Sequence, residues 1–229
     1  MLAAEEAYAS VQDVGCPRGR LRVLALMGFG NLHLVPLLPE FLREHPGIQL
    51  DLVLDDHIGR VLDDDFDVAL RAGLPPRSSL VVRKLRDLHS VVCASPAYLS
   101  THSAPRRPVE LEAHRCLVYS YSNTPEHWSF YRGEVRQSIR IPPTCGVNNS
   151  DALCALTMAG MGIARLPGFV AAPHLRSGEL VPLLRDYTLP SVPLNVLLPS
   201  RRYLPRRVRV FVDMLVGAFA GDAPWERAQ

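Results

Sequence analysis

Lysine is almost missing from this sequence, and its scarcity goes with an even balance of charge. Lys84 is the only lysine, so arginine supplies nearly all of the 25 basic residues. These are scattered among 23 acidic residues, and the formal net charge is only +2. A protein that grips a nucleic-acid backbone needs a basic stripe or patch, because phosphates dominate its affinity. The composition therefore gives no electrostatic basis for this chain itself binding DNA.

Cysteine and histidine do not occur in the spacings of redox or metal sites. The five cysteines are odd in number and form no CxxC pair, and the eight histidines form neither HxH nor HxxxH. These patterns indicate neither a disulfide framework nor a metal site, and we expect no metal and no cofactor. A reduced, cytoplasmic compartment is the simplest expectation. A cysteine hydrolase would need Cys93 or Cys116 beside a base such as His89, but no motif pairs a thiol with a histidine.

Long apolar runs are also absent. No run approaches the roughly 20 residues needed to span a bilayer. The opening residues, MLAAEEAYAS, lack the basic and apolar regions of a secretory signal. We therefore expect no membrane partner. With 48% apolar residues in 229, the chain has enough material for one large core or two smaller ones.

The most informative stretch covers residues 21–56. The apolar run 21–26 ends at Gly28-Phe29-Gly30, which predicts a strand followed by a tight turn. Apolar residues at helical spacing follow, and Pro46-Gly47 stops the helix; its two prolines are tolerated if the regular part begins near Val35. The turn is too short for the GxGxxG dinucleotide fingerprint because it lacks the third glycine.

Residues 48–54 alternate and predict a second strand, which completes a strand–helix–strand unit. Open sheets of that kind bind ligands beyond the carboxyl ends of their strands. Further on, the pattern predicts a helix around residues 61–66 and strands at 67–70, 80–85 and 90–93. Alternating strands and helices with few hairpin signals favour the α/β class.

The second half begins near Leu88. We predict a strand at 116–119 and an exposed antiparallel hairpin from the segments 128–132 and 135–141 around Gly133-Glu134. A buried helix at 150–159, with Asn149 or Ser150 as its N-cap, precedes a strand at 163–166. Further strands at 180–184 and 194–198 lead to a closing amphipathic helix from Val208 to Phe219.

Several of these segments together resemble one family. The segments are GRLRVLALMGFGNLHLVPLLPEFLREHP, FDVALRAG, VVCASPAYL, NNSDALCALTMAGMGIARLP and RRVRVFVDML. In this order and spacing they are similar to the effector-binding portion of LysR-type transcriptional regulators, from about Leu2 to Leu215. The resemblance implies two Rossmann-like α/β lobes joined by a crossover, as in type 2 periplasmic binding proteins. It assigns 1–16 to the tail of a linker helix, 17–87 plus 200–229 to lobe I, and 88–199 to lobe II.

The resemblance also implies partners. It implies a small-molecule effector between the lobes, a homodimer that forms higher oligomers in the full-length protein, and DNA contact only through an N-terminal winged helix-turn-helix. That reader would precede this stretch, so we expect a fragment or truncated product. We expect the dimer to pair the helix bearing Ile58, Val61 and Leu62 with the helix Leu153–Met158. No catalysis is implied. The alternatives are a free solute-binding protein of the same fold and a small α/β hydrolase.

By resemblance, effector contacts are expected at strand ends and helix starts of both lobes. They are Gly28, Phe29, Gly30, Asn31, Asp56, His57, Arg71 and Gly73 in lobe I, and Ser95, Pro96, Tyr119, Ser120, Asn148, Asn149, Ala164 and Arg165 in lobe II. Arg71 and Arg165 are the expected carboxylate partners, because a guanidinium offers paired donors. The alternative for each is an ordinary surface ion pair. Two helix N-terminal regions, at 28–31 and 148–149, favour an anionic ligand.

Overall fold

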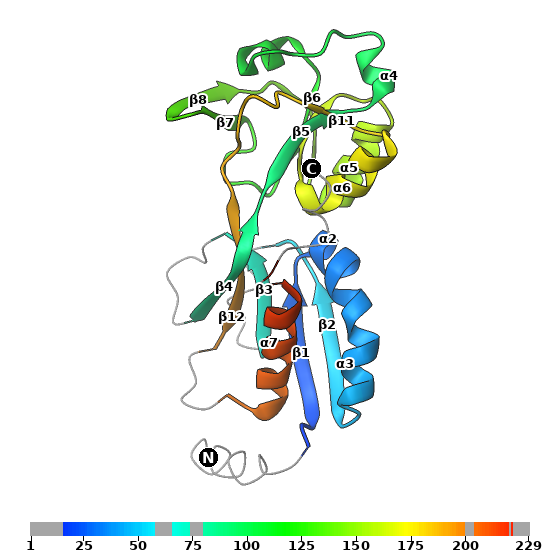
Figure 1. Ribbon diagram of the computed structural model, residues 1–229, viewed down its shortest axis with the longest axis vertical. Coiled ribbons are helices and arrows are strands. Elements are labelled where there is room, and N and C mark those ends of the chain that lie inside the picture. The colour runs from blue at the N-terminus through cyan, green and yellow to red at the C-terminus, as the bar shows by residue number, and fades with distance from the viewer. Residues whose placement is uncertain (1–15, 58–65, 74–79, 200–203, 220, 222–229) are drawn as a thin grey trace. The chain divides into compact units, whose positions relative to one another are not determined.

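The described part of the chain divides into two compact units, each built around a five-stranded sheet (Figure 1). The computed structural model describes residues 16–57, 66–73, 80–199, 204–219 and 221. The first unit takes its described residues from Met1–Arg86 and Pro193–Asp222, and the second from Asp87–Val192. Residues 193–199, which the sequence assigned to lobe II, thus lie in the first unit, because their strand pairs with the first sheet.

The first unit is a mixed sheet in the order β2-β1-β3-β12-β4. β1 pairs in parallel with both β2 and β3, whereas β12 runs antiparallel to β3. The strands are β1 (Gly19–Ala25), β2 (Ile48–Leu54), β3 (Val68–Ala72), β4 (Val81–Leu88) and β12 (Val192–Leu198). The helical segments are α2 (Met27–Phe29), the π-helical turn η2 (Gly30–Leu34), the 3₁₀ turn η3 (Val35–Leu37), α3 (Leu38–Glu44) and α7 (Arg206–Phe219).

The expected tight turn after β1 is wrong, because helical backbone begins at once with α2. It passes through η2 and η3 before regular α-helix is reached at Leu38. Pro36 lies in η3 and Pro39 in the first turn of α3, where a missing N–H removes no regular α-helical bond. The early start places the Phe29 side chain in the core, where none of its surface is exposed.

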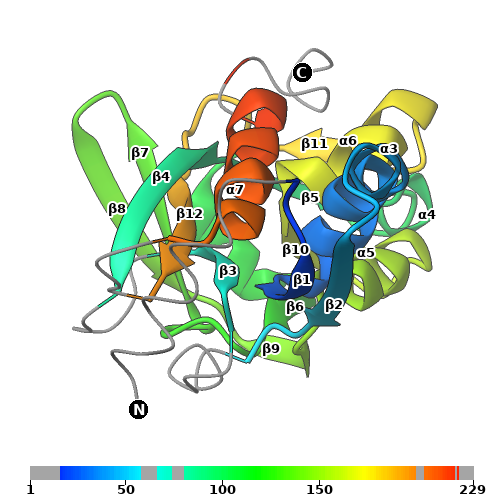
Figure 2. The same ribbon diagram turned by 90° about the horizontal axis from the view of Figure 1, so that it is seen from below.

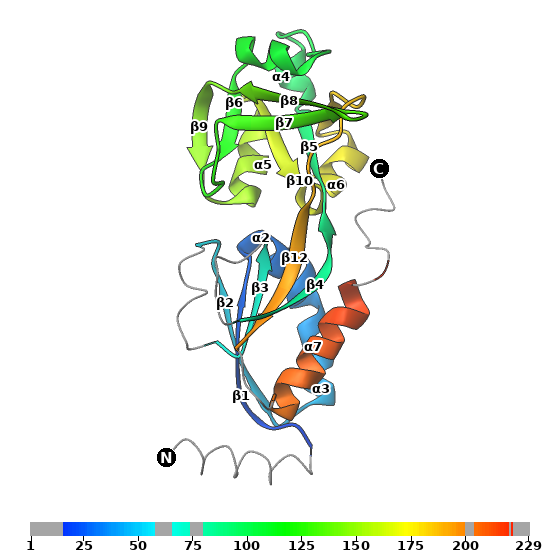
Figure 3. The ribbon, with the colours of Figure 1, turned by 90° about the vertical axis from the view of Figure 1, so that its left-hand side faces the viewer.

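Helices α3 and α7 cover the same face of the first sheet (Figures 2 and 3). Two aromatic pairs connect α7 to the segment after β1. The Phe29 and Phe219 ring centres lie 5.1 Å apart, and those of Phe41 and Phe211 lie 5.3 Å apart, both edge-on. Edge-to-face pairs at this separation add to the free energy gained by burying the rings. The closing helix therefore completes the core that holds the start of the chain.

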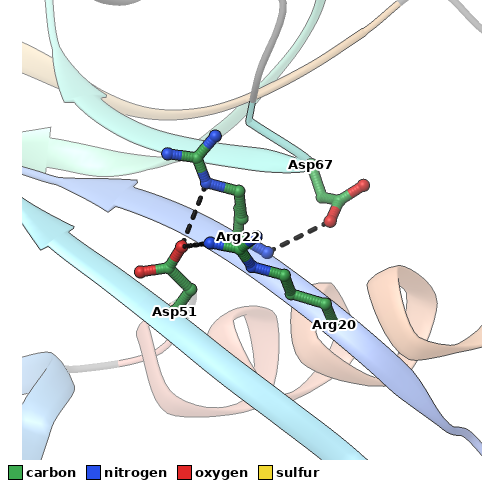
Figure 4. A network of polar contacts seen from close by, with 4 residues as sticks. All are labelled: Arg20, Arg22, Asp51 and Asp67. Atoms are coloured by element: carbon green, nitrogen blue, oxygen red, sulfur yellow. Dashed lines mark hydrogen bonds and ion pairs between the residues drawn. The ribbon is translucent and has the colours of Figure 1, made fainter.

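A charged network fixes the pairing of β1 with its neighbours (Figure 4). Asp51 is the register partner of Arg22, and its carboxylate accepts from Arg20 at 2.6 Å and Arg22 at 3.1 Å. The Asp67 carboxylate accepts from the Arg22 backbone N–H at 3.1 Å. Arg20 holds the pKa of the Asp51 carboxyl below its ordinary value, chiefly through their hydrogen bond. A shift of β1 by one residue would break these contacts.

The second unit has the strand order β11-β5-β10-β6-β9 and a separate hairpin. β6 is parallel to β10 and β9, whereas β5 is antiparallel to β10 and β11. Its strands are β5 (Ser90–Ala94), β6 (Cys116–Tyr119), β7 (His127–Arg132), β8 (Val135–Arg140), β9 (Pro143–Val147), β10 (Ile163–Pro167) and β11 (Val181–Leu183). Its helices are α4 (Pro96–Leu99), the 3₁₀ segment η5 (Pro108–Ala113), α5 (Ser150–Met158) and α6 (Gly168–Ser177).

The predicted hairpin is confirmed as β7–β8, but it is not simply an exposed rim. Trp128 and Phe130 are almost fully buried and belong to one core cluster with Val92, Val118 and Ile163 of the sheet (Figure 3). The sequence reading also missed α6, because Gly168 and Pro173 disguise it. It missed β9, whose residues are mostly exposed.

Some expectations fall outside the described residues. These are the helix at 2–13, residues 58–65 of the predicted second helix, and with them the dimer contacts at Ile58, Val61 and Leu62. Within the part that is described, no helix is long and apolar enough to cross a membrane.

Candidate functional site

The carboxyl ends of three parallel strands bring eight of the expected site residues to one edge of the first sheet. β1 leads into Gly28–Asn31, β2 into Asp56 and His57, and β3 into Arg71 and Gly73. Since the strands are parallel, their carboxyl ends share an edge. The strand–helix–strand reading of residues 21–56 therefore located this group correctly in the first sheet.

Asp56 and Arg71 are buried polar residues that organise this edge from inside. Asp56 is 8% exposed, and its carboxylate accepts a hydrogen bond of 2.8 Å from the Met27 N–H, at the start of the helical segment. Arg71 is 5% exposed and donates to the carbonyl oxygens of Asp55 at 2.6 Å and His57 at 2.7 Å. The guanidinium thus ties the segment after β2 to β3, which differs from the surface ion pair considered for it.

The segment 28–31 is less open to a ligand than the sequence suggested. Gly28, Phe29 and Gly30 are buried, and the Gly30 N–H donates to the Leu26 carbonyl at 2.7 Å. This N–H is therefore not a spare donor, contrary to the expectation for a tight turn. A Cβ at Gly30 would meet the Leu54 side chain, which explains why glycine stands there. Asn31 is exposed and is the member of this segment best placed to meet a ligand.

Asn195 is a buried polar residue at this edge that the sequence reading missed. It lies on β12 with 1% of its surface exposed, and its amide donates to the Gly73 carbonyl at 2.7 Å. The Gly73 N–H donates to the Pro193 carbonyl at 2.8 Å, and Gly73 has a φ of 85°. These bonds hold the chain where it leaves β3. An asparagine within the apolar strand PLNVLL was the available signal.

A second group gathers at the carboxyl ends of β6 and β9. The Ser120 N–H donates to the Val147 carbonyl at 2.8 Å, so Tyr119 and Ser120 lie beside Asn148 and Asn149. Asn149 is confirmed as the N-cap of α5, because its side chain accepts from the Ala152 N–H at 2.8 Å. Its carbonyl oxygen already serves the helix, whereas Ser120 and Asn148 are exposed.

Arg165 is the one expected carboxylate partner whose charge is unanswered in the described structure. It lies half-buried on β10, next to β6, and its guanidinium carbon is 5.8 Å from the centre of the Trp128 ring. It has no hydrogen bond or ion pair with any residue that the structure describes. Burial lowers the pKa of this guanidinium from its ordinary value. A nearby anion would offset the cost of holding this cation out of water. Its neighbour Ala164 is fully buried.

Ser95 and Pro96 do not join the second group. Because β5 runs antiparallel to β10, its carboxyl end lies at the opposite end of the sheet from Tyr119. There the Ser95 hydroxyl accepts from the Tyr98 N–H at 3.3 Å and caps α4, with Pro96 as the first helical residue. Their position accounts for serine and proline by helix capping alone.

Neither group contains an activated nucleophile. Burial raises the pKa of the Cys116 thiol to about 12 and that of Cys154 to about 11, and it raises the pKa of Cys93 further. Thiols in such surroundings stay protonated and inert. Across the described residues, no cluster of three or more His, Cys, Asp or Glu side chains is arranged to hold a metal ion. What the two groups offer is hydrogen bonding and one buried cation, which is chemistry for binding.

Comparison with known proteins agrees with a binding role. The family model described as the LysR substrate binding domain matches residues 15–220. The HTH-type transcriptional regulator PtxR of Pseudomonas aeruginosa is 33% identical over 97% of this chain and 72% of its own length. The HTH-type transcriptional regulator CrgA of Neisseria meningitidis serogroup C is 33% identical over 94% of this chain and 72% of its own.

Solved structures extend the likeness to the fold. The LysR-type transcriptional regulator CrgA from Neisseria meningitidis superposes with a TM-score of 0.82 at 30% identity, over 96% of this chain and 75% of that one. The CrgA regulatory domain superposes with a TM-score of 0.80 at 31% identity, over 89% of this chain and all of that one. The predicted α/β class with a periplasmic-binding-protein-like fold is confirmed.

Proposed function

The chain belongs to the family of LysR substrate-binding domains, the effector-binding part of LysR-type transcriptional regulators, and from this membership we propose that it senses a small anionic molecule. The ligand binds between the two units, and its binding alters how the whole regulator controls transcription. DNA contact belongs to an N-terminal winged helix-turn-helix. The first support is that both units present polar groups at strand ends, where open α/β sheets bind ligands.

The observation that carries the anionic ligand is the unanswered charge of Arg165. A half-buried guanidinium stacked on Trp128, without an acidic partner in the described structure, gains most from a ligand carboxylate. Arg71 is less suited, because its two terminal nitrogens already bind backbone carbonyls. In this proposal Arg165 binds the carboxylate, while Ser120, Asn148 and Asn31 contact the rest of the molecule. Asp56, Arg71, Gly73 and Asn149 hold the surrounding backbone in position.

A thermal-shift screen of small organic acids tests this proposal. A ligand at about 100 times its dissociation constant should raise the free energy of unfolding by roughly 2.7 kcal/mol. We expect at least one acid to raise the melting temperature of the wild type and to have a much smaller effect on Arg165→Met. Arg176→Met removes an exposed arginine of α6 and is the matched control, which should keep the full shift. A hit whose shift survives Arg165→Met unchanged would place its site elsewhere.

A further inference from the structure

A separate pocket of about 440 Å³ lies entirely within the second unit. None of its lining residues is among those assigned to the effector. Its floor is apolar and comes from three elements, with Val92 on β5, Leu183 on β11 and Phe130 on β7, all nearly fully buried. The volume is in the range of small-molecule sites, and apolar walls with a few polar groups are their usual lining.

The wall formed by residues 184–189 is held in a fixed conformation. Leu184 has a φ of 54°, the only left-handed non-glycine residue in the described part of the chain. The Leu184 carbonyl accepts from the Tyr187 N–H at 2.9 Å, and Thr188 exchanges two backbone hydrogen bonds of 2.8 Å with Tyr131. A branched residue in this conformation is strained, and such strain persists only where the surroundings enforce it. The pocket wall is therefore preformed.

The polar groups that line the pocket are of one kind. Arg185 and His89 contribute the chargeable side chains, and no Asp or Glu is among the lining residues. Neither Arg185 nor His89 uses its side chain in a hydrogen bond or ion pair with another described residue. Aromatic rings complete the lining, since the Tyr187 ring meets Phe130 edge-on with ring centres 6.3 Å apart.

We propose that this pocket is a second ligand site, which takes a small aromatic carboxylate. The ring packs on Val92, Phe130 and Tyr187, and the carboxylate meets the Arg185 guanidinium. A sugar or another polyhydroxyl compound fits poorly, because the apolar floor would leave its buried hydroxyl groups without partners. The site is independent of Arg165 and of the effector proposed above.

Isothermal titration calorimetry with 2-naphthoate tests the proposal, using the wild-type chain and the Arg165→Met variant as two starting proteins. We expect saturable binding in both. Arg185→Glu should weaken it by about tenfold or more, because it replaces a charge-assisted contact with repulsion. Leu175→Trp, which places a large side chain at a lining position of α6, should also abolish it. Arg176→Glu is the matched control, since this neighbouring exposed arginine does not line the pocket.

The outcomes separate this site from the effector site. Binding that is retained in Arg165→Met but lost in Arg185→Glu supports the second site, whatever the organic-acid screen finds. No saturable binding by the wild type would overturn it. Equal affinities of folded Arg185→Glu and Leu175→Trp with the wild type would overturn it as well, and so would an equal loss in Arg176→Glu.

Discussion

At the scale of single residues, the edge of the first sheet depends on buried polar groups that face backbone rather than ligand. Asp56, Arg71 and Asn195 each satisfy a main-chain N–H or carbonyl where a strand ends. The residue types could be recognised from the sequence as polar residues at strand ends. Their partners could not, because these bonds join residues distant along the chain.

The Arg71 clamp leads to a stability prediction. Arg71→Met keeps much of the side-chain bulk but leaves the carbonyl oxygens of Asp55 and His57 without this donor. We expect the free energy of unfolding, measured by urea denaturation, to fall by about 2–3 kcal/mol. Arg43→Met, at an exposed ion pair with Glu40, should change it little. An equal loss in the two variants would contradict the clamp.

His114 gives the molecule a dependence on pH. Burial, together with the nearby His102 ring, lowers the pKa of His114 below its usual 6.5, and its Nδ1 lies 3.1 Å from the Tyr98 hydroxyl. The folded state therefore binds fewer protons than the unfolded state, so stability is lost as the pH falls below about 6.5. His114→Gln should flatten this part of a plot of unfolding free energy against pH. Exposed His127→Gln should leave its slope as in the wild type.

At the scale of elements, strands and helices with clear periodicity were predictable, including β1, β2, β3, the β7–β8 hairpin, α5 and α7. Two failures have physical causes. α6 contains Pro173 and starts at a glycine, yet packing of its Val170 and Ala171 into the core overrides that composition. The segment 27–37 is helical because Phe29 and Leu34 gain more by burial than the glycines and prolines cost.

Two glycines in different elements should respond to alanine with opposite signs. A Cβ at Gly162, just before β10, would meet the backbone carbonyl of Arg115, which already accepts from the Ile163 N–H at 2.8 Å. Gly162→Ala should therefore lower the free energy of unfolding by about 1–3 kcal/mol. Gly217 lies in α7 with open space around it, so Gly217→Ala should raise stability by roughly 0.5–1 kcal/mol. Thermal denaturation distinguishes the two, and a shift of the same sign in both would contradict this account.

At the scale of the whole molecule, the sequence predicted the two α/β units but not the direction of every strand. The antiparallel β5 moves Ser95 and Pro96 away from the group that contains Tyr119 and Asn148. Strand direction depends on pairings between distant segments, which no local pattern of these residues records. Residue types at the remaining positions of the candidate site were predicted, and their contacts with a ligand stay a proposal.

We predict that the chain forms a homodimer through α5. Leu153 is buried within the second unit and cannot contribute as first expected, whereas Leu156 and Met158 remain partly exposed and Met161 is 40% exposed. Sedimentation at tens of micromolar should therefore show a dimer, and Met158→Glu should shift it toward monomer. Val135→Glu changes a more exposed apolar residue in β8 and should leave the dimer intact. A wild-type monomer at these concentrations would contradict the prediction.

The central claim is that Arg165 binds a carboxylate of the effector. It is tested most directly by titrating the best acid from the screen, and its uncharged amide, into the wild type and Arg165→Met by calorimetry. These four dissociation constants form a double-mutant cycle that isolates the interaction between the two charges. We predict a coupling of about 1.5 kcal/mol or more, with the amide binding both proteins almost equally. A coupling near zero, with the acid binding both folded proteins equally well, would contradict the claim.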